Sequence, residues 1–113
     1  EQGGYEGAQW LLERQPDLTA IMAGNDKMAI GAMRYLKEQK RRVPDDVSVI
    51  GMDDVPAAEF SNPGLTTIRH DLFGIGAKAV DGALALFRKE SEAVHEVLPV
   101  QLVVRESTGP ARS

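Results

Sequence analysis

Polar side chains follow two short apolar runs of this sequence. Asn25 and Asp26 come directly after the first run. Asp53 and Asp54 come shortly after the second. Amide and carboxylate groups together offer donors and acceptors that match the hydroxyl groups or ring nitrogens of a small molecule. If both runs are strands of one parallel sheet, these side chains share the edge beyond the strands' carboxyl ends, where such sheets bind ligands.

Some of these residues also have a simpler structural interpretation. In this interpretation Asn25 or Asp26 serves solely as the cap of the helix that follows, because Asn and Asp are favoured at that boundary. Asp54 could only order its loop. Asp53 lies just past Gly51 and has no helix to cap. We therefore expect Asp53 to be the strongest candidate for contact with a ligand.

The reactive side chains do not predict catalysis. Asp53 and Asp54 are neighbours whose side chains diverge, which makes them a poor acid–base pair. His70 and His95 are isolated and lack the spacing of metal ligands. The sequence has no cysteine, and no serine lies in a GxSxG motif. We expect no enzyme, no metal site and no bound cofactor.

The charge balance argues against nucleic-acid binding by these residues themselves. Thirteen Lys and Arg residues stand against seventeen Asp and Glu residues among 113, a formal net charge of −4, whereas phosphate binding needs a basic face. The most basic stretch, residues 37–42, ends a predicted helix, where cations suit the helix dipole. No apolar run approaches the roughly 20 residues that span a membrane. The chain begins with Glu1 and shows no signal peptide, so we expect it to be part of a longer protein.

The hydrophobic pattern alternates between strands and helices. It predicts helices at residues 4–15, 26–39 and 71–89, a helical turn at 57–60, and extended segments at 18–24, 47–51, 65–69, 97–98 and 100–104. Strand, helix and strand within about 30 residues form a βαβ unit, so we expect an α/β fold with a parallel Rossmann-like sheet flanked by helices. The last helix should bury a stripe of Leu72, Gly76, Ala79, Val80, Ala83 and Phe87. The tail after Ser107 should be loose.

Two apolar residues outside the predicted core could belong either to the ordinary surface or to a contact with a partner protein. Ile30 lies outside the apolar stripe of the second predicted helix, on the side that carries Arg34, Lys37 and Arg41. Single exposed apolar residues are common, but the edge of a subunit contact has the same composition. Trp10 lies opposite the apolar stripe of the first helix, where a partly covered surface position is favoured over a partner contact.

Four ordered motifs resemble the LacI/GalR family of bacterial transcription regulators. They are GNDKMAIGAMRYL at residues 24–36, VPDDVSVIGMDDVP at 43–56, NPGLTTIRHD at 62–71 and LPVQLVVREST at 98–108. Together they cover nearly the whole chain at the family's spacing. One departure is Met52, which stands where the family frequently has Phe or Tyr before the paired aspartates.

The resemblance implies a partial periplasmic-binding-protein-like (type I) effector domain. Residues 1–67 and 100–106 would belong to its C-terminal lobe and residues 71–97 to its N-terminal lobe. Family members are cytoplasmic homodimers that bind operator DNA through an N-terminal helix-turn-helix, and this DNA-binding domain is not among these residues. A small-molecule effector, a sugar or a nucleobase-like compound, would bind between the lobes and alter the affinity for DNA.

The resemblance also implies roles for individual residues. Asn25 and Asp53 match positions that commonly contact the effector. His70 stands where the family often has Gln, and it either faces the cleft or satisfies the local backbone. Leu72 occupies a place where some members put an aromatic ring against the ligand. Ile30 matches a position in the family's dimer contact, and Phe60 lies in the neighbouring loop.

Two other classes of protein share this architecture. The first is the sugar-binding protein of an ABC transporter, which the paired aspartates, the LTTI run and the closing REST disfavour. The second is an enzyme, since fold does not determine function. An effector domain without its other strands would leave an unpaired sheet edge, so we expect these residues alone to self-associate or to be partly disordered.

Overall fold

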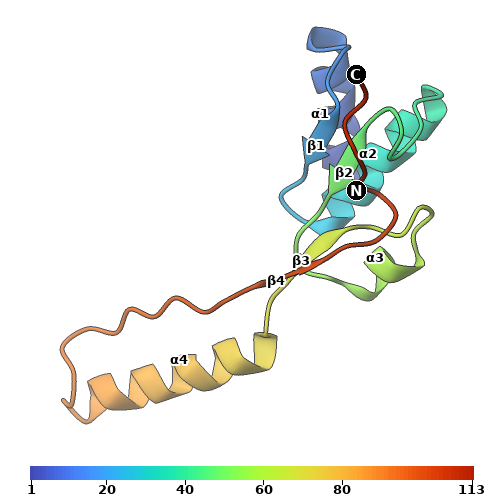
Figure 1. The fold of residues 1–113 in the computed structure, drawn as a ribbon. Coiled ribbons are helices and arrows are strands. Elements are labelled where there is room, and N and C mark those ends of the chain that lie inside the picture. Colours follow the sequence, from blue (N-terminus) through green and yellow to red (C-terminus); the bar gives the residue numbers. More distant parts are fainter. The chain divides into compact units, whose positions relative to one another are not determined.

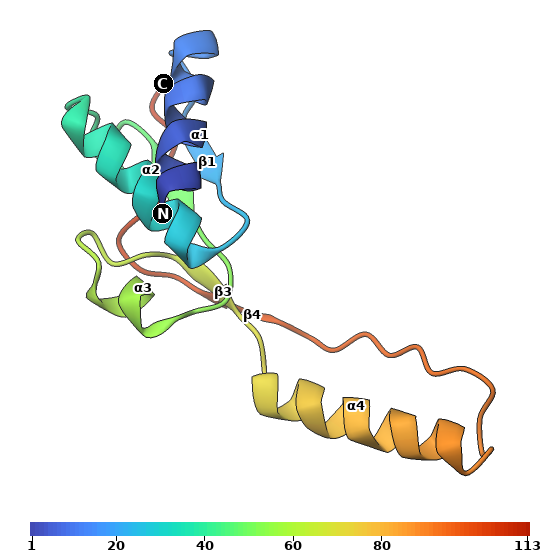
Figure 2. The same ribbon diagram turned by 180° about the vertical axis from the view of Figure 1, so that it is seen from behind.

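The computed structural model describes all 113 residues, which divide into two compact units. The first unit comprises Glu1–Arg69 and Leu102–Ser113, and the second comprises His70–Gln101. Figures 1 and 2 show the elements of each unit from opposite sides. The assignment of residues to the lobes of a larger domain stays a prediction.

A parallel βαβ unit forms the centre of the first unit. Strand β1 (Ala20–Met22) pairs in parallel with β2 (Ser48–Ile50), and helix α2 (Asp26–Glu38) connects them. A parallel bridge from Ile50 to Thr66 continues the ladder toward β3 (Thr67–Arg69). Strand β3 in turn pairs with β4 (Gln101–Val103). The predicted α/β class and its βαβ unit are confirmed.

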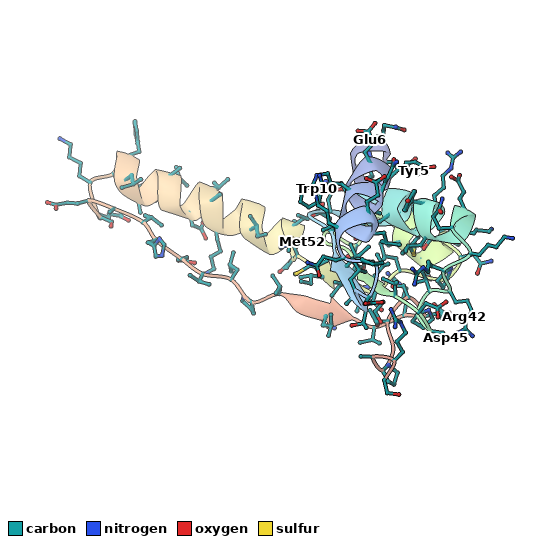
Figure 3. All side chains as sticks on the ribbon, turned by 90° about the horizontal axis from the view of Figure 1, so that it is seen from above. Tyr5, Glu6, Trp10, Arg42, Asp45 and Met52 are labelled. Atoms are coloured by element: carbon teal, nitrogen blue, oxygen red, sulfur yellow. The ribbon has the colours of Figure 1, made fainter.

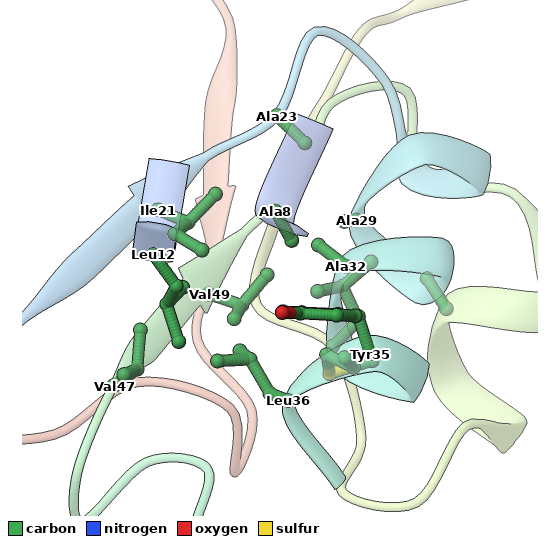
Figure 4. Close-up of a cluster of buried hydrophobic side chains, with 13 residues drawn as sticks. Ala8, Leu12, Ile21, Ala23, Ala29, Ala32, Tyr35, Leu36, Val47 and Val49 are labelled. Carbon is green, nitrogen blue, oxygen red and sulfur yellow. The ribbon is translucent and has the colours of Figure 1, made fainter. Parts of the chain in front are cut away.

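The hydrophobic core lies between the sheet and two helices. Helix α1 (Gln2–Arg14) packs against α2, and the largest fully buried apolar side chains are Leu36, Leu65, Val47 and Val49. Figure 4 shows this cluster, which side chains from both helices and both strands form together. Burial of these side chains contributes about 1.5–3 kcal/mol each.

The two helices approach each other at glycines. A Cβ atom at Gly4 would overlap the Met28 carbonyl group, and one at Gly31 would overlap the Glu1 carbonyl group. Any larger residue at either position would force the helices apart. On the outer face of α1, Trp10 is 54% exposed and Arg14 lies over its ring at 4.1 Å, as expected for a partly covered surface tryptophan (Figure 3).

The second unit contains one helix, α4 (Leu72–Phe87), followed by an extended segment. The predicted burial of its apolar stripe is wrong, because Leu72 is 72% exposed and Phe87 is 86% exposed. Gly82 is the one buried residue of the helix, and it lies against Val94. A single extended segment cannot cover a whole helix face. Residues 97–98, predicted as an extended segment, do not pair as a strand.

The C-terminal segment is anchored, which corrects the expectation of a loose tail. Ser107 is fully buried, and its hydroxyl group donates to the Val49 carbonyl oxygen at 2.6 Å and accepts from the Thr66 amide at 2.8 Å. The Gly109 amide donates to the Ser48 hydroxyl group at 3.1 Å. Residues 107–109 therefore lie against β2, held by hydrogen bonds that the hydrophobic pattern cannot reveal.

Candidate functional site

The two strand ends that carry the polar residues lie side by side. The Asp26 amide donates to the Met52 carbonyl oxygen at 2.9 Å, just beyond the point where the Ala23 amide donates to Ile50 at the same distance. These bonds extend the β1–β2 pairing past both strands. The start of α2 and the loop that bears Asp53 therefore form one edge of the sheet, as the sequence predicted.

Asn25 caps helix α2. Its backbone is extended (φ −157°), and its side-chain oxygen accepts from the Met28 amide at 2.9 Å. The capping interpretation therefore holds for Asn25 and not for Asp26, which is the first helical residue. Because the carbonyl oxygen of Asn25 is used in the cap, its amide NH2 group is the part suited to donate to a ligand.

Asp26 is the buried centre of this edge. It is 1% exposed, and its carboxylate accepts from the Val55 amide at 2.8 Å and from the Thr67 hydroxyl group. Gly51 leaves room for it, since a Cβ atom there would overlap the carboxylate. Asp26 thus ties α2 to the loop after β2 and to β3. Sequence reasoning considered Asp26 as a ligand group or a cap and missed this structural role, because both partners are distant in the chain.

Asp53 is presented by a loop with unusual backbone geometry. Asp53 has φ 110° and Asp54 has φ 55°, values that non-glycine residues adopt infrequently. The Asp53 amide donates to the Ile68 carbonyl oxygen at 2.8 Å, which attaches the loop to β3. The Asp53 residue is exposed at the sheet edge. Strained backbone of this kind is common where a loop presents side chains to a ligand.

Asp54 makes ion pairs with two arginines. Its carboxylate accepts from Arg69 Nε at 2.7 Å and from Arg105 Nη2 at 2.9 Å, and its side chain is only 10% exposed. Burial raises the pKa of this carboxyl group, but the hydrogen bonds from Arg69 and Arg105 outweigh burial and lower the pKa overall. Asp54 therefore orders its loop, as the simpler interpretation predicted, and it stays charged at neutral pH.

The other two predicted ligand residues belong to the second unit. His70 is its first residue and is partly buried, and Leu72 begins α4 and is mostly exposed. Asn25 and Asp53 lie together in the first unit. A contact of His70 or Leu72 with an effector stays a prediction.

The predicted dimer residues lie on another face of the first unit. Ile30 is partly buried, packs against the core, and lines a groove of about 610 Å³. Apolar and cationic side chains line this groove together: Ile30, Met33, Val43, Arg34, Lys37, Lys40, Arg41 and Arg42. Phe60, at the end of α3 (Pro56–Phe60), is 82% exposed. Figure 3 labels Arg42 and Asp45, which mark this side of the unit.

Neither a metal centre nor a membrane span is evident. Nowhere in the chain do three or more His, Asp or Glu side chains converge as metal ligands. None of the helices has the length and apolar character needed to cross a membrane.

A parallel βαβ unit with polar groups beyond its strand ends places the chain in the class of ligand-binding α/β domains. More narrowly, the chain belongs to the family of periplasmic binding protein-like domains, whose family model matches residues 1–108. The predicted fold is thereby confirmed.

The relatives confirm the resemblance to LacI-type regulators. The chain is 36% identical over 107 residues to the lactose operon repressor of Klebsiella pneumoniae, which covers 95% of this chain and 30% of that protein. It is 40% identical over 106 residues to the HTH-type transcriptional repressor PurR of Pasteurella multocida, covering 92% of this chain and 31% of that protein. The chain thus spans about three tenths of the length of these relatives. Both are transcriptional repressors rather than enzymes.

Solved structures agree. The Lac repressor dimer bound to operator and the anti-inducer ONPF matches with a TM-score of 0.87 at 36% identity, covering 95% of this chain and 37% of that one. A complex of the transcriptional regulator CelR with cellobiose matches with a TM-score of 0.86 at 36% identity, covering 92% of this chain and 32% of that one.

Proposed function

We propose that this chain is the effector-sensing and dimerisation part of a cytoplasmic LacI-family transcriptional regulator. It binds a small molecule, a sugar or a nucleobase-like compound, and does not catalyse a reaction. A helix-turn-helix elsewhere in the whole protein binds operator DNA. The observation that carries the proposal is the Asp26–Met52 backbone hydrogen bond, because it brings Asn25 and Asp53 to one sheet edge.

The chemistry of this edge suits a ligand that bears hydroxyl groups. Asn25 offers NH2 donors, and the Asp53 carboxylate offers acceptors. A sugar hydroxyl group donates and accepts at once, so hydroxyl groups of a sugar can pair with a donor such as Asn25 and with an acceptor such as Asp53. Related regulators were solved with lactose and with ribose, which supports a sugar as the first class to test.

The effector acts by a population shift. It binds better to one arrangement of the protein's lobes, and this preference changes the affinity of the DNA-binding end. The alternative, a sugar-binding protein of an ABC transporter, is not favoured, because the relatives described above are transcription regulators.

Dimerisation through the face of Ile30 and Phe60 is part of the same proposal. Phe60 is 82% exposed, and the neighbouring groove mixes apolar and charged side chains. Subunit contacts commonly combine an apolar centre with charges at the rim.

The test of effector binding is Asp53→Ala in the whole natural protein, titrated calorimetrically with lactose, cellobiose and ribose. Loss of a buried hydrogen bond costs about 1–3 kcal/mol, so we expect the affinity for the bound sugar to fall roughly 5- to 150-fold. Asp17→Ala, at an exposed turn remote from the sheet edge in sequence, is the matched control and should bind normally. Equal affinities for the two variants would contradict a role of Asp53 in binding.

A further inference from the structure

One carboxylate binds both arginines at the points where the chain leaves and re-enters the first unit. Arg69 is the last residue before the second unit begins at His70, and Arg105 follows β4 after the chain has returned. Asp54 Oδ2 accepts from Arg69 at 2.7 Å and Oδ1 accepts from Arg105 at 2.9 Å. One side chain therefore binds an arginine close to each of the two covalent connections.

Arg105 is itself fixed by several bonds. Its Nη1 donates to the Leu65 carbonyl oxygen at 2.9 Å, its amide donates to the Thr66 hydroxyl group at 2.9 Å, and its side chain is 15% exposed. Ion pairs that are shielded from solvent and share further hydrogen bonds are more specific in geometry than exposed pairs. Arg69, at 49% exposed, is the looser of the two partners.

Asp54 also lies in the loop that presents Asp53, and its contacts restrain the backbone of that loop. Asp53 and Asp54 both have positive φ angles, and such residues persist only where their surroundings hold them. The Asp53 amide bonds to Ile68, and the Asp54 amide donates to the Thr67 hydroxyl group at 3.3 Å. The side-chain ion pairs of Asp54 add a further restraint on this geometry.

We propose that Asp54 is a positioning residue, which couples the Asp53 loop to both connections between the units without contacting the effector itself. Both of its oxygens already accept from arginine, and its side chain is only 10% exposed, which leaves little of the carboxylate accessible to a ligand. The proposal rests on the proposed function, in which Asp53 binds the effector. Its consequence is that the position of Asp53 and the course of both connections change together.

The first experiment needs no ligand. Hydrogen–deuterium exchange is measured on the whole natural protein with Asp54→Asn, which keeps the shape and removes the charge. We expect the Asp53 and Arg105 amides to exchange at least tenfold faster, while the amides of Ala29 and Val49 in the core keep their rates. Unchanged exchange at Asp53 and Arg105 overturns the proposal, and so does an equal acceleration of all four amides, because that is global destabilisation.

Two further variants keep the result decisive. Asp46→Asn is the matched control, since Asp46 also pairs with an arginine, Arg42 at 3.1 Å, but lies away from this edge in the sequence. It should leave the Asp53 and Arg105 amides unchanged. If Asp54→Asn does not fold, Arg69→Ala removes only the more exposed of the two pairs. It should speed exchange at Asp53, and no change there overturns the proposal.

Calorimetry with lactose, cellobiose and ribose separates this inference from the proposed function. If the natural protein binds one of them, Asp54→Asn should weaken that binding about tenfold while the core amides keep their exchange rates. Equal affinity despite faster loop exchange overturns the coupling to Asp53. If none of the sugars binds, the proposed sugar specificity fails, and the exchange pattern alone decides whether Asp54 positions the loop.

Discussion

Replacing Asp26 with alanine should destabilise the first unit more than any other single polar change at the sheet edge. The carboxylate is 1% exposed and accepts from the Val55 amide and the Thr67 hydroxyl group. Alanine leaves both buried donors without a partner. Each such loss costs about 1–3 kcal/mol, and relief from burying a charge offsets part of the sum. We expect the free energy of unfolding to fall by about 3 kcal/mol.

Two further variants, at Asn25 and at Asp26 itself, give smaller expected losses with which Asp26→Ala can be compared. Asn25→Ala removes only a helix cap, which costs about 1 kcal/mol. Asp26→Asn keeps the shape of the side chain, and its amide can present its oxygen to the Val55 amide and its NH2 group to the Thr67 hydroxyl oxygen, which accepts as well as donates. We expect Asp26→Asn to cost less than about 1 kcal/mol, well below the loss for alanine.

Equilibrium urea unfolding followed by circular dichroism measures these differences. With a urea dependence of about 2 kcal/mol per molar, a loss of about 3 kcal/mol lowers the midpoint by roughly 1.5 M. If Asp26→Ala lowers the midpoint no more than Asn25→Ala does, Asp26 does not hold the edge together, and the reasoning from its two hydrogen bonds is wrong.

Three further predictions concern other contacts. Gly51→Ala forces a Cβ atom into the Asp26 carboxylate, so the free energy of unfolding should fall by about 1–3 kcal/mol in the same urea assay. The pKa of Asp46 is lowered from 3.8 to about 2 by hydrogen bonds from the Arg42 side chain and backbone; its stabilisation is therefore complete above about pH 4 and lost as the pH falls toward 2. Urea midpoints of the natural protein and Asp46→Asn should accordingly converge between pH 5 and pH 2. Ile30→Glu places a carboxylate in the proposed dimer contact and should convert dimers to monomers in sedimentation velocity.

The dimer prediction has a matched control outside the proposed contact, on helix α1. Trp10→Ala removes a large aromatic residue that is 54% exposed and has Arg14 over one face of its ring. It should leave the dimer intact. Phe60→Ser removes an aromatic residue of similar exposure from the proposed contact and should weaken the dimer. Monomers from Trp10→Ala, or dimers from both Ile30→Glu and Phe60→Ser, would place the interface elsewhere.

Local pattern predicted the βαβ unit and the place of its polar residues, because apolar runs and the residues that end them are encoded nearby. The roles within the edge were less accessible. Asp26 bonds to residues 29 and 41 positions away, and no local signal indicates such partners. Conversely, the periodicity of α4 predicted an apolar stripe correctly but could not say whether anything covers it. Burial depends on what lies opposite, and Leu72 and Phe87 are exposed.

Strand lengths show a similar limit. The apolar runs at residues 18–24 and 47–51 are longer than β1 and β2, which have three residues each. Hydrophobicity marks residues that are buried, whereas a strand includes only those that pair with a neighbour. Ser107 lies in the closing REST motif, but the hydrophobic pattern gives no indication that this serine is completely buried.

The burial of Ser107 bears on how this protein emerges from the ribosome. The residue completes the hydrogen bonding of β2 and of the segment before β3, yet it is synthesised after the whole of His70–Gln101. At translation rates of about 5–20 residues per second, the intervening unit delays its arrival by roughly 2–6 s. During that interval the Val49 carbonyl group and the Thr66 amide lack the hydrogen bonds that Ser107 later forms with them. A ribosome-associated chaperone would therefore meet the first unit before these hydrogen bonds form. A protein truncated by a nonsense codon before residue 107 would never form them.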